Sequence, residues 1–213
     1  MFRAAFTMAL ATSVLLVAAR AEASSHPVCA PRHSFTVAAN REVRVYAVVD
    51  HYGGRTVWAC YLRTERRFKL GTFDPHDIDY PDRVKVRLAG RLVGSLTSHR
   101  DHYGEGDLQV VVRDVRTGTI LHRAEKQGND LQEGAPAWDP ARFVMDRAGS
   151  VAWTATATEV DGAQTYYVFE SDSTRWAQQA DAGPDLDPES LRRHGKTLTW
   201  TKGGTTRAAQ FVR

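Results

Sequence analysis

The sequence predicts an all-β fold built from about four similar antiparallel units. Three observations lead to this prediction. No stretch of the chain keeps the 3.6-residue apolar period of a helix for three turns. Instead, apolar and polar residues alternate over short runs, as at residues 43–49 and 108–115, which is typical of strands. Gly, Asp, Asn and Pro interrupt these runs, and one arrangement of turn and strand recurs four times.

Each recurring unit begins with a turn residue followed by a short apolar strand. The four turn residues are Asn40, Gly90, Gly149 and Gly195, which lie 50, 59 and 46 residues apart. We expect each of them to take the positive φ of a tight turn. The apolar strand that follows it is expected to be buried on both faces.

A period near 50 residues with about four strands in each repeat is typical of β-propeller blades. The sequence therefore predicts a small or partial β-propeller-like array within one domain, residues 24–213. A β-sandwich built from the same hairpins is the alternative. The predicted units lie near residues 33–74, 82–125, 141–181 and 186–213.

The repeats resemble those of TolB-like and WD40-like propellers. Residues 90–93, Gly-Arg-Leu-Val, and 149–153, Gly-Ser-Val-Ala-Trp, are similar to the Gly-x-x-apolar-apolar strand of those repeats, and residues 110–118 form an apolar strand that ends in Asp-x-x-Thr-Gly. Only the second unit carries this turn, and residues 170–174 of the third unit read Glu-Ser-Asp-Ser-Thr instead. The chain also resembles secreted proteins of high-GC Gram-positive bacteria that share the N-terminal Cys and the repeats. The resemblance covers residues 35–213 and implies an exported, propeller-like protein.

The first residues predict a secretory signal peptide, residues 1–23. Residues 1–3 give a short positive start, and residues 4–19 are uncharged with an apolar stretch at 14–19. Ala21-Glu22-Ala23 supplies the small-x-small pattern that signal peptidases accept. The apolar run is shorter than the roughly 20 residues of a spanning helix. We therefore expect no membrane span after cleavage, and a protein that is secreted, extracellular or associated with the cell envelope.

The two cysteines, Cys29 and Cys60, both follow the predicted cleavage point. In an oxidising compartment an even pair of cysteines is usually bridged. On the loop-entropy model, closing this loop would stabilise the fold by roughly 3–4 kcal/mol. We predict a structural disulfide that fixes the N-terminal arm to the strand carrying Cys60, because a redox or metal role would need closer spacing or further ligands.

Charge and motifs exclude several functions. The formal net charge is +3, and removal of Arg3, Arg20 and Glu22 with the signal peptide leaves +2. So balanced a charge does not predict a nucleic-acid partner. The sequence holds no Gly-x-Ser-x-Gly, no Ser-x-x-Lys and no phosphate-binding glycine loop. These features favour a non-catalytic protein, which we expect to be a monomer.

Residues 74–82 contain four carboxylates and one His within nine residues, a composition that suggests a metal ion. Hard cations such as Ca²⁺ favour carboxylate oxygens, so calcium is the single candidate cofactor. The spacing does not match an EF-hand loop, and no Gly stands at the sharp turn. An exposed linker between two units is therefore the interpretation we favour. The candidate metal ligands are Asp74, Asp77, Asp79 and Asp82.

Three further residues are candidates for binding. His99 and His102 lie in the acidic, glycine-containing segment 99–107, where a connection between two strands is expected. They offer ring nitrogens to a ligand, although no partner of known metal-site spacing accompanies them. Trp138 lies in residues 134–140, a predicted loop, and is a candidate exposed recognition residue; the alternative is that its ring caps the core.

Two hypotheses of function follow from these features. The first is an exported, non-catalytic binding module whose loops contact a protein or a cell-envelope polymer. The second is a secreted hydrolase or lyase that uses carboxylates and His from segments 74–82 and 99–107. The second requires those two segments to converge on one cavity.

Overall fold

The computed structural model describes residue 29 and residues 31–73, 83–100, 106–126, 137–158 and 161–211. The predicted signal peptide, residues 1–23, lies outside this part. The described residues form fifteen β-strands. Among them no helix has the length and hydropathy needed to cross a membrane.

The strands form four antiparallel sheets, each a simple meander. Sheet 1 contains β1 (Ser34–Ala39), β2 (Val43–Val49), β3 (Arg55–Tyr61) and β4 (Arg66–Phe73). Sheet 2 contains β5 (Arg83–Ala89), β6 (Leu92–Arg100), β7 (Gly106–Asp114) and β8 (Ile120–Lys126). Sheet 3 contains β9 (Ala137–Met145), β10 (Val151–Thr158), β11 (Gln164–Asp172) and β12 (Arg175–Gly183). Sheet 4 contains β13 (Leu186–His194), β14 (Thr197–Lys202) and β15 (Thr205–Gln210).

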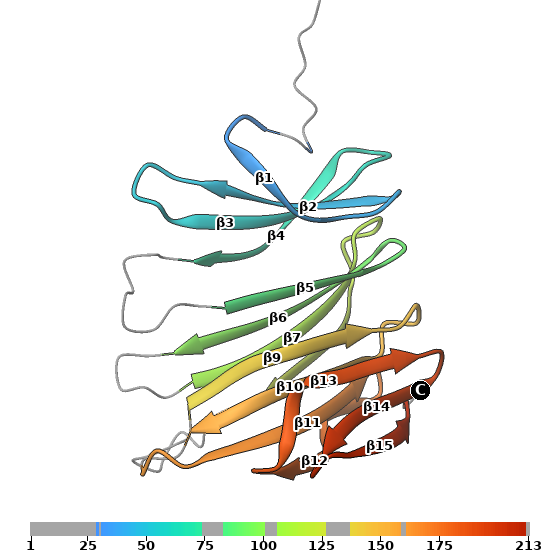
Figure 1. Cartoon of the computed structure of the whole chain (residues 1–213). Coiled ribbons are helices and arrows are strands. Elements are labelled where there is room, and N and C mark those ends of the chain that lie inside the picture. The colour runs from blue at the N-terminus through green and yellow to red at the C-terminus, as the bar shows by residue number, and fades with distance from the viewer. Residues whose placement is uncertain are drawn as a thin grey trace, which may run out of the picture.

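The sheets stack in sequence order, with sheets 1 and 4 at opposite ends of the array (Figure 1). One apolar cluster fills each junction between consecutive sheets. Val45 and Val93 belong to the cluster between sheets 1 and 2, and Phe143 and Leu96 to the one between sheets 2 and 3. The third cluster joins sheets 3 and 4 around Trp200. The predicted all-β, partial propeller-like array of about four antiparallel units is confirmed.

In sheets 2 and 3 the second strand is the most deeply buried one, as the sequence predicts. Five successive residues are buried in β6, 92–96, and five in β10, 151–155. Gly90, Gly149 and Gly195 have the predicted positive φ, at 59°, 95° and 62°.

The same prediction is wrong for Asn40. The first unit holds its turn with a side chain, because the Asn40 Oδ1 atom accepts hydrogen bonds from the N–H groups of Glu42 and Val43, both at 2.8 Å. The Asn40 Nδ2 atom also donates to the Gly90 carbonyl at 2.8 Å, so this residue ties sheet 1 to sheet 2.

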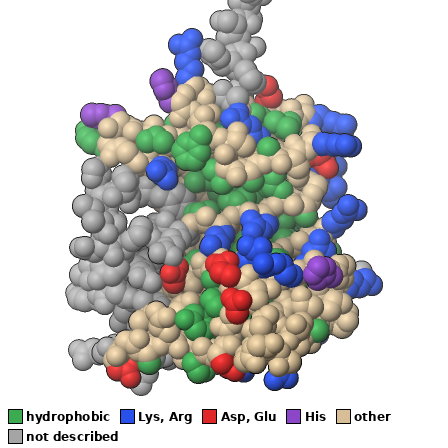
Figure 2. Space-filling view, viewed as in Figure 1, with side chains coloured by type: hydrophobic (Ala, Val, Ile, Leu, Met, Phe, Trp, Pro, Cys, Tyr) green, Lys and Arg blue, Asp and Glu red, His purple; other side chains and the backbone are tan. Residues whose placement is uncertain are grey.

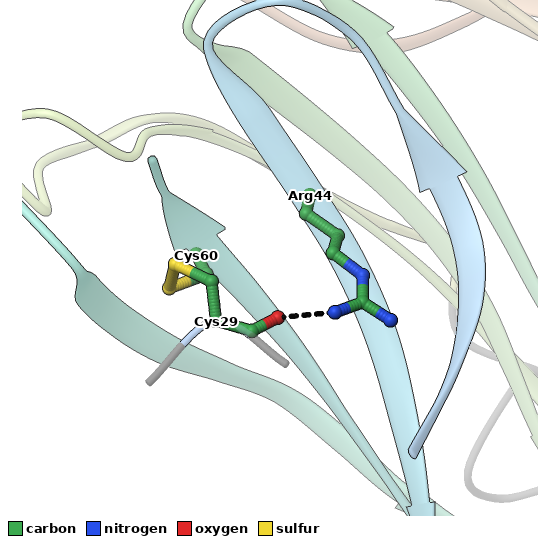
Figure 3. The surroundings of a disulfide bond; sticks show 3 residues. All are labelled: Cys29, Arg44 and Cys60. Atoms are coloured by element: carbon green, nitrogen blue, oxygen red, sulfur yellow. Dashed lines mark hydrogen bonds between the residues drawn. A yellow bond between two sulfur atoms is a disulfide. The ribbon is translucent and has the colours of Figure 1, made fainter. Parts of the chain in front are cut away.

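The predicted disulfide between Cys29 and Cys60 is confirmed (Figure 3). It lies on the face of sheet 1 that is turned away from sheet 2, where both sulfur-bearing residues pack against the buried Tyr46. Arg44 Nη1 donates a hydrogen bond of 2.8 Å to the Cys29 carbonyl. The disulfide therefore fixes the segment before β1 over the outer face of sheet 1, which has no neighbouring sheet among the described residues.

Candidate binding groove

The meander topology separates two ends of the array. Seven turns lie at one end, at the right in Figure 1, which we call the turn end. They are β1–β2, β3–β4, β5–β6, β7–β8, β9–β10, β11–β12 and β13–β14. The β2–β3 turn and the strand ends that flank residues 74–82 and 101–105 lie at the other end.

The turn end is basic. Exposed cations stand in six of the seven turns, and Arg175 directly follows the seventh. Lys and Arg side chains gather along this edge of the molecule in Figure 2. Three of the acids at this end, Asp114, Asp146 and Asp172, accept hydrogen bonds from turn N–H groups. The cations within the turns are Arg41, Arg63, Arg91, Arg116, Arg147 and Lys196.

A groove opens at the turn end where sheets 1, 2 and 3 meet. It consists of three adjoining hollows of about 520, 380 and 240 Å³, and Leu121 at the start of β8 lines all three. The largest hollow lies among the β1–β2, β5–β6 and β9–β10 turns and is lined by Glu42, Arg91 and Arg147. The other two lie between β8 and the turns of sheet 3. The largest two have the volume of a small-ligand site.

His122 and Asp172 line both smaller hollows and are 7% and 3% exposed. Asp172 ends β11, and its Oδ1 atom accepts hydrogen bonds from the Thr174 N–H (2.7 Å), the Thr174 hydroxyl (2.7 Å) and the Arg175 N–H (2.9 Å). The Asp172 Oδ2 atom and the His122 Nε2 atom are buried without a hydrogen-bond partner in the described part of the chain.

Burial and the neighbouring groups set the charges of His122 and Asp172. Burial lowers the pKa of His122, and the nearby charge of Asp172 opposes part of that shift, so the imidazole is neutral near pH 7. Burial raises the pKa of Asp172, but the hydrogen bonds from Thr174 and Arg175 outweigh it and the pKa is lowered. The floor of the groove therefore holds one carboxylate and one neutral imidazole.

The rim of the smallest hollow combines cations with an exposed aromatic ring. Arg123, Arg175 and Trp176 line it, and Trp176 is 69% exposed. No ion pair of Arg123 or Arg175, and no aromatic or cation–π contact of Trp176, occurs within the described ranges. The rim thus presents two cations and an uncovered indole face to solvent.

The structure brings few of the sequence-predicted site residues together. Asp74, Asp77, Asp79, Asp82 and His102 lie outside the described residues. The backbone of His99 lies in β6, paired with Asp107, and its side chain is not described. Within the described part of the chain, no three His, Cys, Asp or Glu residues are grouped so as to hold a metal ion.

The prediction of a loop around Trp138 is wrong. Trp138 is the second residue of β9, is 4% exposed, and packs edge-on against Tyr167 and Phe169 at ring-centroid distances of 5.1 and 5.7 Å. Pro140 suggests a loop, but among the described strands β9 pairs only with β10, and a register shift beside Pro140 accommodates its missing N–H. The indole fills the core and is not exposed for recognition.

Sequence reasoning missed the residues that form the groove, namely Leu121, His122, Arg123, Asp172 and Trp176. One signal in the sequence points to them. The third unit departs from the Asp-x-x-Thr-Gly turn of the second, and Asp172, Arg175 and Trp176 all lie at that departure. Nothing in the sequence indicates that β8 of the preceding sheet would lie beside it.

The fold and the groove define an all-β, propeller-like array with a basic groove at one end. No protein-family model matches the chain, and no curated protein matches it. Among solved structures, it is similar to the periplasmic gluconolactonase PpgL of Pseudomonas aeruginosa, with a TM-score of 0.32 and 16% identity. The similarity covers 73% of this chain and 40% of PpgL, so the chain spans less than half the length of that protein. The function is therefore argued from the groove itself.

Proposed function

We propose that this protein is an exported binding module whose groove binds an acidic glycan of the cell envelope. The observation that carries the proposal is the rim of the groove, where the 69%-exposed Trp176 lines one hollow together with Arg123 and Arg175. The proposed activity is binding without turnover.

The chemistry of the rim favours an acidic sugar polymer. The face of an indole ring is electron-rich and packs well against the C–H groups of a sugar ring. Guanidinium groups bind carboxylate and phosphate groups with paired hydrogen bonds. A chain of sugar rings that carries acidic groups presents both features at a regular spacing, and the adjoining hollows extend the contact past Leu121 toward Arg147.

Two observations support export. The Cys29–Cys60 disulfide is of a kind that persists in oxidising compartments. The N-terminal residues have the composition of a signal peptide. A cell-envelope polymer would be the partner at hand in that location.

The test is a calorimetric titration of residues 24–213 with an oligogalacturonate of defined length. A neutral dextran oligosaccharide and a poly-glutamate peptide are titrated in parallel. We expect the oligogalacturonate to bind and dextran to bind far more weakly. Equal binding of dextran, or binding of poly-glutamate alone, would contradict the proposal, and the latter would indicate a protein ligand.

Variants locate the site in the same assay. We expect Trp176→Ala to weaken binding about tenfold, the effect of removing a stacking partner worth roughly 1.4 kcal/mol. The double variant Arg123→Ala/Arg175→Ala should weaken it further and reduce its salt dependence. Tyr52→Ala and Arg207→Ala are matched controls, because they remove an exposed aromatic ring and an exposed cation away from the groove.

A further inference from the structure

The second turns of sheets 1, 2 and 3, namely β3–β4, β7–β8 and β11–β12, carry large apolar side chains that face solvent. Leu62 lies in the first of these turns, Ile120 and Leu121 begin β8 after the second, and Trp176 is the second residue of β12. They are 40%, 39%, 40% and 69% exposed. The other turns at the turn end carry no large exposed apolar side chain within the described residues. The exposed apolar groups of this end therefore gather in one row.

Contacts between the sheets join these turns into one surface. Gly118 of the β7–β8 turn packs so closely on Phe68 of β4 that a Cβ atom at Gly118 would lie 2.5 Å from the Phe68 ring. Leu121 and Trp176 line the same hollow of about 240 Å³. The three turns thus lie side by side across three sheets. We call the row of Leu62, Ile120, Leu121 and Trp176 the apolar ridge.

Five exposed arginines flank the apolar ridge. Glu65 is the single exposed acid that accompanies them in residues 62–66, 115–123 and 173–176. None of the five forms an ion pair within the described ranges, and the Arg66 guanidinium lies over the Phe68 ring at 5.0 Å. Their charges are therefore available to an external anion. The five are Arg63, Arg66, Arg116, Arg123 and Arg175.

We propose that the apolar ridge and its arginines dock the protein on a bilayer of anionic phospholipid. Apolar side chains enter the boundary between headgroups and acyl chains, while arginines stay at the level of the phosphates. Each cation near an anionic membrane strengthens binding about fivefold. The inference goes beyond the binding of a glycan and does not rest on it, because neither Leu62 nor Ile120 lines the groove.

A bilayer matches this surface better than a linear polyanion or a folded protein does. A polyanion would be attracted by the arginines but would offer no apolar surface to Leu62 and Ile120, whereas acyl chains do. The apolar side chains stand on separate turns, so a protein partner would need a separate hollow for each of them. A fluid layer of headgroups accepts such projections without a matching shape.

The test is co-sedimentation of residues 24–213 with lipid vesicles. One set of vesicles contains equal parts of phosphatidylglycerol and phosphatidylcholine, and the other contains phosphatidylcholine alone. We expect the protein to pellet with the mixed vesicles and far more weakly with phosphatidylcholine, and high salt should release it. Failure to bind the mixed vesicles would overturn the proposal. Equal binding to both sets would also overturn it, because the arginines would then contribute nothing.

A double variant locates the docking surface. Leu62→Ser/Ile120→Ser should reduce partition onto the mixed vesicles about tenfold, whereas Phe35→Ser/Val49→Ser should leave it unchanged. The second variant is the matched control, since Phe35 and Val49 are 44% and 39% exposed at the opposite end of sheet 1. Parent partition in the folded Leu62→Ser/Ile120→Ser protein would overturn the apolar ridge. The same variant should bind the oligogalacturonate as the parent does, so the two proposals fail in separate assays.

The fluorescence of Trp176 gives a second measurement that needs no altered ridge. Trp176 is the most exposed tryptophan of the chain, and an indole ring that enters a membrane interface leaves water. Tryptophan emission of the parent should shift to shorter wavelength with the mixed vesicles, and Trp176→Phe should lose most of this shift. Vesicle binding without the shift would overturn insertion of the ridge and leave a purely electrostatic contact, such as an acidic protein could also make.

Discussion

The β7–β8 and β11–β12 turns both begin with an aspartate at the end of the third strand of their sheet. In each turn the Oδ1 atom of that aspartate accepts backbone N–H groups, from Arg116 in sheet 2 and from Thr174 and Arg175 in sheet 3. The second oxygen differs. Asp114 Oδ2 pairs with Arg91, whereas Asp172 Oδ2 is buried beside His122 without a described partner.

This difference separates two roles of an aspartate carboxylate, which can form a turn with one oxygen and bind a second partner with the other. The turn itself needs only one oxygen, because Asp172 forms its turn without a pair for the second. The second oxygen can therefore tie two turns of a sheet together, as in Asp114, or lie buried without a described partner, as in Asp172. In sheet 2 the second oxygen of Asp114 pairs with Arg91. In sheet 3 the second oxygen of Asp172 is buried without a described partner.

The largest expected loss of stability comes from removing both carboxylate oxygens of either aspartate. Asp114→Ala and Asp172→Ala should each lower the free energy of unfolding by about 1–3 kcal/mol, because each leaves several turn donors unsatisfied. Urea denaturation of both variants measures this effect. A loss at one turn only would show that the two aspartates do not share the turn-forming role.

Replacement by asparagine should then separate the two sites. Asp114→Asn loses the ion pair with Arg91 and should be measurably less stable than the parent. Asp172→Asn keeps its turn hydrogen bonds and should stay within about 0.5 kcal/mol of the parent, since no cation is paired with its second oxygen. The same denaturation experiment compares them, and equal losses would contradict the distinction.

The acid side of the stability curve offers a third comparison. Burial raises the pKa of Asp114, but the hydrogen bonds from Arg91 and Arg116 outweigh it and the pKa is lowered. A lowered carboxyl pKa contributes stability above its unfolded value, and this is lost as the pH falls through the folded value. Arg91→Ser should raise the Asp114 pKa and leave that of Asp172 unchanged. Carboxyl ¹³C shifts measured during an acid titration report both values.

The smallest expected effect concerns His122. Its folded pKa lies below the ordinary value of 6.5, so on acidification the unfolded chain binds a proton before the folded protein does. The parent should therefore lose stability as the pH falls below about 6.5, before the lowered carboxylates titrate. His122→Gln should make this decline in melting temperature shallower. An unchanged slope would mean that His122 is not buried as described.

The architecture could be predicted because it depends on local signals. Alternation in residues 108–115 marks a strand whatever lies around it, and Gly90, Gly149 and Gly195 mark turns because few other residues adopt positive φ. The disulfide followed from there being only two cysteines. Asn40 shows the limit of this logic, because its side chain holds the turn without the positive φ expected of the position.

The groove could not be predicted because it depends on contacts between sheets. His122 comes from the last strand of sheet 2 and Asp172 from the end of β11 in sheet 3, so their proximity follows from how two sheets stack. Trp138 and Trp176 show the same difficulty. A proline nearby suggested exposure for the buried Trp138, whereas the exposed Trp176 lies in an ordinary-looking strand on the outer edge of sheet 3.

The disulfide on the outer face of sheet 1 also bears on the groove, because the β1–β2 turn of that sheet lines it through Glu42. In a linear stack each unit is held by its neighbours, so the outermost units open first. A reductant that breaks the Cys29–Cys60 bond should make sheet 1 exchange its amide hydrogens ahead of sheets 2 and 3. Opening of sheet 1 would withdraw Glu42 from the groove and release the bond from Asn40 to Gly90. In a reducing environment the groove would therefore lose the part of its lining that sheet 1 supplies, and in an oxidising one it would keep it.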